Sequence, residues 1–86
     1  MKSFTYTITD PLGIHARPAG LLAKAAKAYS DTTVTVTKDE STVKASQLMK
    51  LMGLGVKQGN TVTVAAEGPA EEEAIIAMKK FFEENL

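Results

Sequence analysis

The only histidine of the chain, His15, stands between Gly13 and Pro18, with Arg17 two residues after it. Proline is favoured in the first turn of a helix, so the imidazole is expected beside backbone N–H groups that lack intrahelical partners. Such a helix end attracts anions, and the forked guanidinium of Arg17 can bind a phosphate through two hydrogen bonds. A free imidazole titrates at about pH 6.5, and much of it is therefore neutral and nucleophilic at pH 7. Together these residues predict a histidine that accepts a phosphoryl group.

Other histidine chemistry lacks its partners in this sequence. There is no second histidine and no cysteine for a zinc site, and no Walker-type glycine-rich loop for a nucleotide. We therefore expect neither a metal nor a cofactor. A lone histidine in a small domain is more commonly a surface or structural residue, and that interpretation is the alternative to the phosphoryl acceptor.

The composition limits the class of protein. Eighty-six residues make one domain over residues 1–86 with a modest core. Ten basic and ten acidic side chains give a formal net charge of zero, which does not favour a nucleic-acid partner. The absence of cysteine fits a reducing cytoplasm, and no apolar stretch approaches the ~18 residues of a membrane span. We expect a cytoplasmic protein that is not inserted in a membrane.

Hydrophobic periodicity predicts four strands and three helices. Apolar residues alternate with threonines or other polar residues over 2–9, 32–37, 42–45 and 61–66. Helical patterns cover 18–28, 46–53 and a segment that opens at Gly68, with Pro69 in its first turn. The buried stripe of the first helix is predicted to include Leu21, Leu22, Ala25, Ala26 and Tyr29. The order βαββαβα predicts an α/β fold of the α+β type: an open-faced β-sandwich whose four-stranded antiparallel sheet carries three helices on one face.

The second helix has more apolar residues than one buried face needs. Ser46 is predicted as its N-cap and Gly53 lies near its end. Because its four large apolar residues occupy more than one side, at least one is expected outside the core, as on a contact surface. The alternative is a helix buried on all sides between two layers. The four residues are Leu48, Met49, Leu51 and Met52.

The stretch from Leu12 to Ala19 resembles the active-site signature of the HPr family, the histidine-containing phosphocarriers of the bacterial phosphoenolpyruvate:sugar phosphotransferase system. The stretch from Leu48 to Gly55, with the following Gln58-Gly59, resembles its second signature, and the similarity covers essentially the whole chain. The resemblance implies the same open-faced β-sandwich. It also implies a stoichiometric carrier, not a turnover enzyme.

In this family, phosphorylated enzyme I passes its phosphoryl group to Nδ1 of the histidine that matches His15, and the carrier hands the group to IIA domains of sugar permeases. The resemblance implies that Arg17 stabilises the phosphate and that the N–H groups of Ala16 and Arg17 cap it. In family members the first two helices dock both partners, and we expect a monomer that presents this one surface. The docking residues implied here are Lys24, Lys27, Leu48, Met49, Lys50, Leu51 and Met52.

Ser46 has two interpretations. In many Gram-positive members, HPr kinase phosphorylates a serine at the start of the second helix as a regulatory brake. Alignment on Leu54-Gly55 puts Gln47 at that position and Ser46 one residue earlier. Ser46 is therefore either a regulatory phosphorylation site or only the helix N-cap.

Two further hypotheses belong to other classes. An HPr-like regulatory protein would keep the phosphorylation but control another protein instead of feeding sugar import. An RNA-binding or small-molecule module is less favoured, because the five aromatic residues form no stacking pair flanked by basic residues.

Overall fold

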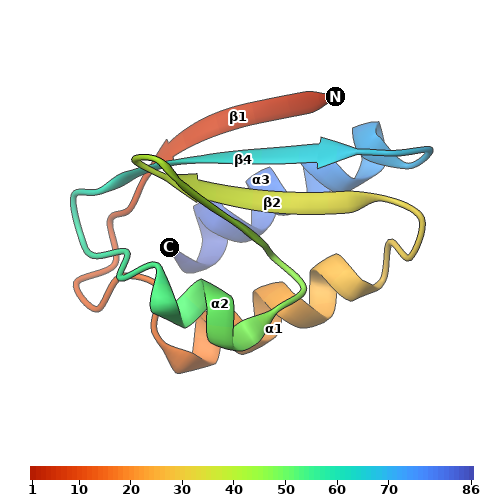
Figure 1. Cartoon of the computed structure of the whole chain (residues 1–86). Helices are drawn as coiled ribbons and strands as arrows, with labels where there is room; N and C mark the ends of the chain where they lie inside the picture. The colour runs from red at the N-terminus through yellow and green to blue at the C-terminus, as the bar shows by residue number, and fades with distance from the viewer.

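Seven helices and strands follow one another in the predicted order βαββαβα in a computed structural model that describes all 86 residues. Most boundaries lie within two residues of the predicted ones. The elements in Figure 1 are β1 (Lys2–Thr7), α1 (Ala16–Lys27), β2 (Thr33–Lys38), β3 (Ser41–Lys44), α2 (Leu48–Gly53), β4 (Thr61–Glu67) and α3 (Glu71–Asn85).

The strands form one sheet in the order β1-β4-β2-β3, and every neighbouring pair is antiparallel. Alternation along each strand separates two faces. One row on the inner face holds Phe4, Val64, Val36 and Val43. The next row, on the outer face, holds one threonine from each strand: Thr5, Thr63, Thr37 and Thr42. The predicted threonine-rich face open to water is confirmed.

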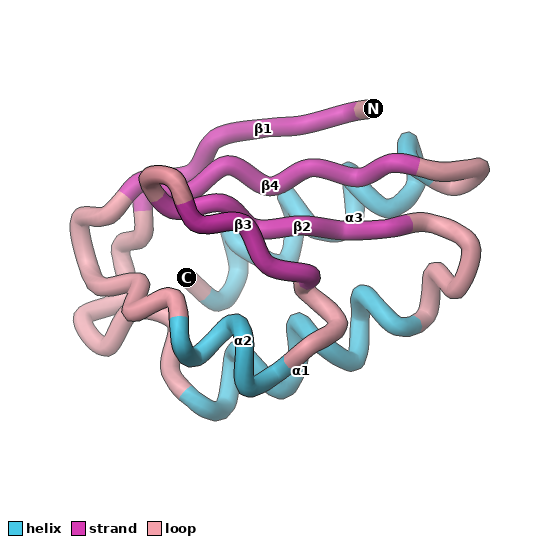
Figure 2. Tube along the Cα trace, in the orientation of Figure 1, coloured by secondary structure: helices cyan, strands magenta, loops and turns pink.

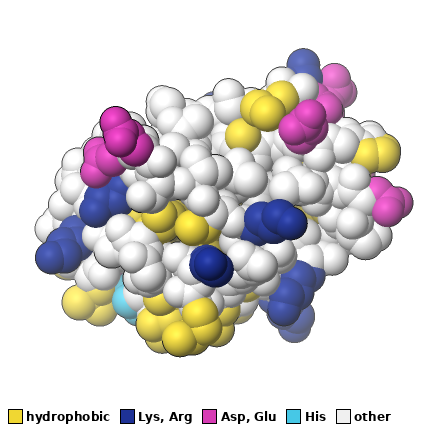
Figure 3. All heavy atoms as spheres, in the orientation of Figure 1, with side chains coloured by type: hydrophobic (Ala, Val, Ile, Leu, Met, Phe, Trp, Pro, Cys, Tyr) yellow, Lys and Arg dark blue, Asp and Glu magenta, His cyan; other side chains and the backbone are white.

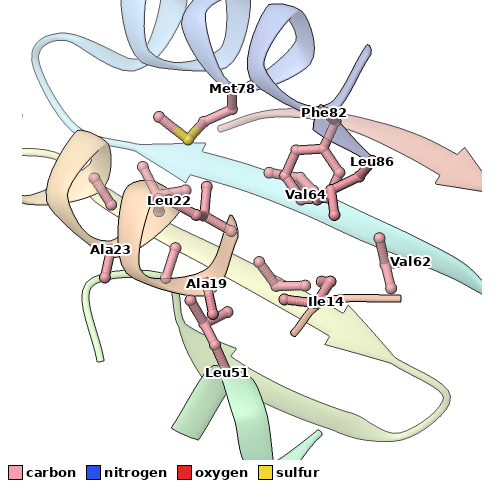
Figure 4. Packing of buried hydrophobic residues seen from close by; sticks show 14 of the residues in the cluster. Ile14, Ala19, Leu22, Ala23, Leu51, Val62, Val64, Met78, Phe82 and Leu86 are labelled. Atoms are coloured by element: carbon pink, nitrogen blue, oxygen red, sulfur yellow. The ribbon is translucent and has the colours of Figure 1, made fainter. Parts of the chain in front are cut away.

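All three helices cover the inner face of the sheet (Figures 1 and 2), so the predicted open-faced β-sandwich is confirmed. Phe82 of α3 lies at the centre of the core and is completely buried. Its ring makes edge-to-face contacts with Phe4, Tyr6 and Phe81, at centroid distances of 5.9, 5.6 and 6.2 Å. Figure 4 shows Leu22 and Met78 from the helices packed toward the same layer of valines.

The first helix buries a different stripe from the predicted one. Ala19, Leu22, Ala23 and Ala26 are buried, whereas Leu21 is exposed. The predicted burial of Leu21 was wrong because three small alanines let α1 approach the core along their own side. Leu21 is left on the surface of the helix that faces away from the sheet.

Two other boundaries differ for reasons visible in the hydrogen bonds. The first strand ends at Thr7, not Thr9, because pairing with β4 starts at Thr61. Pro69 lies before α3, not in its first turn, because the helix begins at Glu71. The chain is turned there by Gly68, whose φ is +144°, and by the hydroxyl of Thr32, which accepts a hydrogen bond from the N–H of Ala70 at 2.9 Å.

Candidate functional site

The loop between β1 and α1 is fixed from both sides before it reaches His15. The N–H groups of Thr9 and Asp10 donate to the main-chain oxygen of Leu86 at 2.6 and 2.9 Å. On the other side, the Gln58 amide donates to the carbonyl of Thr9 at 3.1 Å. Leu86 is itself buried in the core, so the loop is attached to the end of α3.

Within the loop, Asp10 makes a tight turn and Gly13 allows a close backbone approach. An Asp10 carboxylate oxygen accepts from the N–H of Leu12 at 2.8 Å, and the Asp10 carbonyl accepts from the N–H of Gly13 at 2.9 Å. Gly13 has φ +66°, and a Cβ there would lie 2.2 Å from the carbonyl oxygen of Val56. Only glycine fits this position, two residues before His15.

His15 is the N-cap of α1. Its backbone is extended, with φ −93° and ψ −177°, and its carbonyl accepts the first helical hydrogen bond from Ala19 at 2.9 Å. The imidazole is half-buried and makes no capping hydrogen bond with the helix. Figure 3 shows it at the molecular surface, beside hydrophobic side chains. Neither ring nitrogen of His15 is therefore hydrogen-bonded to the backbone N–H groups at the start of α1.

The first N–H groups of α1 are available to an anion. Those of Ala16 and Arg17 make no hydrogen bond within the protein, and Pro18 has no N–H. The helix dipole adds partial positive charge at this end. The structure thus brings together the predicted phosphate-holding groups, Ala16 and Arg17, and the predicted acceptor His15.

Arg17 and His15 line one shallow hollow of about 250 Å³. The guanidinium of Arg17 is exposed and has no carboxylate within 4.0 Å, so it is free to bind a ligand. Sequence reasoning missed four other residues that line the hollow: Asp10, Leu21, Glu84 and Asn85. The turn around Asp10 was visible in the sequence, but no spacing pattern links the end of α3 to this loop.

The predicted docking residues lie on the surfaces of α1 and α2, with one exception. Leu48, Met49 and Met52 are exposed on α2, and Met49 has 78% of its surface accessible. The lysines Lys24, Lys27 and Lys50 are exposed and make no ion pair. Leu51 was wrongly predicted as a surface residue: its exposure is 0%, and it anchors α2 to the core. The predicted surplus of apolar residues outside the core is confirmed.

The prediction that Ser46 is the N-cap of α2 was wrong. The N-cap of α2 is Gln47, whose carbonyl accepts the first helical hydrogen bond from Leu51 at 3.0 Å. A turn closed by the N–H of Gln47 and the carbonyl of Lys44, at 3.1 Å, delays the helix by one residue. Ser46 is half-buried in this turn.

Nowhere do three or more His, Cys, Asp or Glu side chains lie together as metal ligands would. The longest helix, α3, has 15 residues, and none of the helices has the length and apolar character needed to cross a membrane.

Comparisons with known proteins assign this chain to a family. The family model described as "PTS HPr component phosphorylation site" matches residues 2–84. The phosphocarrier protein HPr of Mycoplasma genitalium is 38% identical over 85 residues, which are 99% of this chain and 97% of that protein. A solved Mycoplasma histidine-containing phosphocarrier protein is 34% identical, with a TM-score of 0.92 over 96% of this chain and 93% of its own. A structure described as an HPr dimer from Thermoanaerobacter tengcongensis is 44% identical, with a TM-score of 0.76, and the match covers 98% of this chain and 95% of that chain. The chain therefore belongs to the HPr family and is a phosphocarrier of the phosphotransferase system.

Proposed function

We propose that His15 is the phosphoryl acceptor, that phosphorylated enzyme I is the donor, and that IIA domains of sugar permeases receive the group. The observation that carries this proposal is the position of the imidazole. It caps α1 without a capping hydrogen bond, beside the unpaired N–H groups of Ala16 and Arg17. The family implies a cytoplasmic relay in which the chain is a stoichiometric carrier and not an enzyme.

The proposed transfer uses His15 and Arg17, which line the hollow, and the first two N–H groups of α1. The lone pair of Nδ1 on neutral His15 attacks phosphorus, while the bond from phosphorus to the donor breaks and its electron pair leaves with the donor. The proton of the neutral ring stays on Nε2. The N–H groups of Ala16 and Arg17 and the guanidinium of Arg17 bind the phosphoryl oxygens. The second transfer reverses these steps toward the IIA domain.

We propose that both partners dock on the exposed faces of α1 and α2. Leu48, Met49 and Met52 supply a flexible apolar centre, and Leu12 and Leu21 extend it toward His15. The lysines Lys24, Lys27 and Lys50 favour partners that are acidic around an apolar contact. Leu51 supports the surface from inside.

The phosphoryl assignment is tested with enzyme I and radiolabelled phosphoenolpyruvate. We expect one label per chain, labile in acid and stable in alkali, and none in His15→Ala. Circular dichroism of the variant controls for folding, and label retained by a folded His15→Ala protein would refute the assignment. Onward transfer to a purified IIA domain separates the carrier from the regulatory alternative. Light scattering of the phosphorylated chain tests the proposed monomer.

Ser46 is proposed as a second, regulatory phosphorylation site. Its hydroxyl is partly exposed and makes no hydrogen bond in the turn before α2. A phosphate there would add negative charge at the edge of the docking surface. The test is incubation with HPr kinase and ATP followed by mapping of the label, and a map without Ser46 would remove the proposal.

A further inference from the structure

A second polar hollow lies at the other end of α1 from His15. It has a volume of about 280 Å³ and opens between the end of α1, the start of β2 and the residues that follow β3. Figure 2 shows that the chain leaving β3 turns toward α2. The β3 pairing therefore begins at Thr35, and the first two residues of β2 have no β3 partner on that edge. The residues that line the hollow come from three separate segments of the chain.

Two lysines line this hollow from different elements. Lys27 comes from the last turn of α1, and Lys44 is the last residue of β3. Neither lysine has a carboxylate within 4.0 Å of its ammonium group. The two ion pairs of the protein are elsewhere and join Met1 to Glu71 and Lys2 to Glu72. Two unpaired cations that line one hollow repel each other weakly. An anion bound between them attracts both and offsets that repulsion.

The other polar groups of the hollow are hydroxyls, and most are free. The side chains of Ser30, Thr33 and Ser46 make no hydrogen bond within the protein, whereas that of Thr32 is already bonded to the N–H of Ala70. Hydroxyl groups donate to phosphate oxygens as readily as they accept from other groups. The lining therefore offers both charge and hydrogen-bond donors to an anion.

No acidic residue lines this hollow, in contrast to the hollow at His15. There, Asp10 and Glu84 share the surface with Arg17. Here the nearest acids along the chain and in the sheet register are Asp31 and Glu67, and both are exposed residues outside the lining. The negative end of the α1 dipole opposes an anion here, because the N–H groups of Ala28 and Tyr29 bond to only two of the last carbonyls, those of Ala25 and Ala26. The two lysines carry two full positive charges, which exceed the dipole's roughly half a negative charge. The balance of charge favours an anion.

We propose that this hollow binds a small phosphate monoester. A phosphate between Lys27 and Lys44 uses the two cations, and the hydroxyls of Ser30, Thr33 and Ser46 can contact a small polar body attached to it. The volume is close to the lower end of the range for small-molecule sites, about 300 Å³. The site is shallow and open, and we expect dissociation constants in the millimolar range.

The test is a nitrogen–proton NMR titration of the full chain at pH 7.5 with inorganic phosphate and, separately, with glycerol 3-phosphate. Sodium chloride is reduced as ligand is added, so that ionic strength stays constant. We expect saturable shifts of the Ser30, Thr33 and Ser46 amides. Lys44→Gln should weaken binding about fivefold or more, which corresponds to one unit charge about 4 Å from the anion in water.

Lys79→Gln is the matched control, because Lys79 is exposed and unpaired on α3, outside the hollow. It should leave the dissociation constant unchanged, and Lys27→Gln should repeat the effect of Lys44→Gln. Arg17→Gln removes shifts at the His15 end without changing those at Ser46. Shifts that do not saturate, or that Lys79→Gln reduces as much as Lys44→Gln, would overturn the proposal. The outcome is independent of the labelling of His15.

Discussion

Replacing Gly13 by alanine tests whether the loop geometry positions His15. The new Cβ would lie 2.2 Å from the Val56 carbonyl oxygen and 2.7 Å from the Cα of Lys57. Both neighbours are backbone, so no side-chain rotation relieves the contact. To reach 3.0 Å, the oxygen and the Cβ must separate by a further 0.8 Å. The loop that carries His15 has to move away from the segment before β4.

The stability cost follows from two effects. A left-handed backbone costs an L-residue about 1–2 kcal/mol. The movement also breaks the hydrogen bond from the N–H of Ile14 to the Val56 carbonyl, now 3.2 Å, worth about 0.5–1.5 kcal/mol. We expect the free energy of unfolding to fall by about 1.5–3.5 kcal/mol in urea titrations. A domain of this length has about 4–13 kcal/mol in total, so most of the protein stays folded at low temperature.

The functional cost follows from the displacement. A shift of about 1 Å in a reacting group can lower a transfer rate by about a hundredfold. In the folded variant, we expect the initial rate of labelling by enzyme I to fall by about tenfold to a hundredfold. Gly20→Ala is the control: this glycine lies inside α1, where an added Cβ would meet no neighbouring atom within 4 Å, and alanine there should stabilise the helix by about 0.5–1 kcal/mol. A Gly13→Ala protein that unfolds and is labelled like the parent would refute the reasoning.

Two further predictions use the same unfolding measurements. Leu51→Ala should lower the free energy of unfolding by about 2–5 kcal/mol, because it leaves a cavity in the core. Met49→Ala on the same helix should change the free energy of unfolding by less than about 0.5 kcal/mol and should instead weaken partner binding. Equal destabilisation by both variants would contradict the assigned burial. The hydrogen bond from the amino group of Met1, at 3.0 Å, and that from the N–H of Gly68 lower the pKa of Glu71 below its ordinary value of 4.5. The contribution of Glu71 to stability is therefore complete above about pH 4.5 and is lost as the pH falls through the lowered native pKa. The free energy of unfolding of Glu71→Gln should therefore depend less steeply on pH below pH 4.5. An unchanged slope would argue against this ion pair.

The sheet and the acceptor loop could be predicted because their signals are local. Alternating residues identify each strand, and the inner row of Phe4 and Val64 follows once the strands pair. The relation of His15 to Arg17 and Pro18 depends on a few consecutive residues at one helix end. Local sequence therefore predicted the layer that supports the candidate site and the place of His15 and Arg17 at the start of α1.

What could not be predicted depends on packing between distant segments. Glu84 reaches the His15 hollow only because α3 extends to Asn85 and Leu86 fixes the acceptor loop. Leu51 and Met49 have the same hydrophobic character, and only the position of α2 against the core decides which is buried. Ser46 has the better intrinsic preference for an N-cap, but the turn between Lys44 and Gln47 gives that place to Gln47.

The hollow at His15 is suited to holding a phosphoryl group briefly. A carrier must bind the group well enough to accept it and weakly enough to release it to the next protein. In the proposed phosphohistidine, Arg17 and the free N–H groups would stabilise the phosphate, whereas the carboxylates of Asp10 and Glu84 in the same hollow would oppose an added dianion. The imidazole is also only half-buried, so water and a docked partner can both reach it. A deeper and uniformly positive pocket would bind phosphate more tightly and would slow the second transfer, which is the step that makes a phosphohistidine useful to a relay.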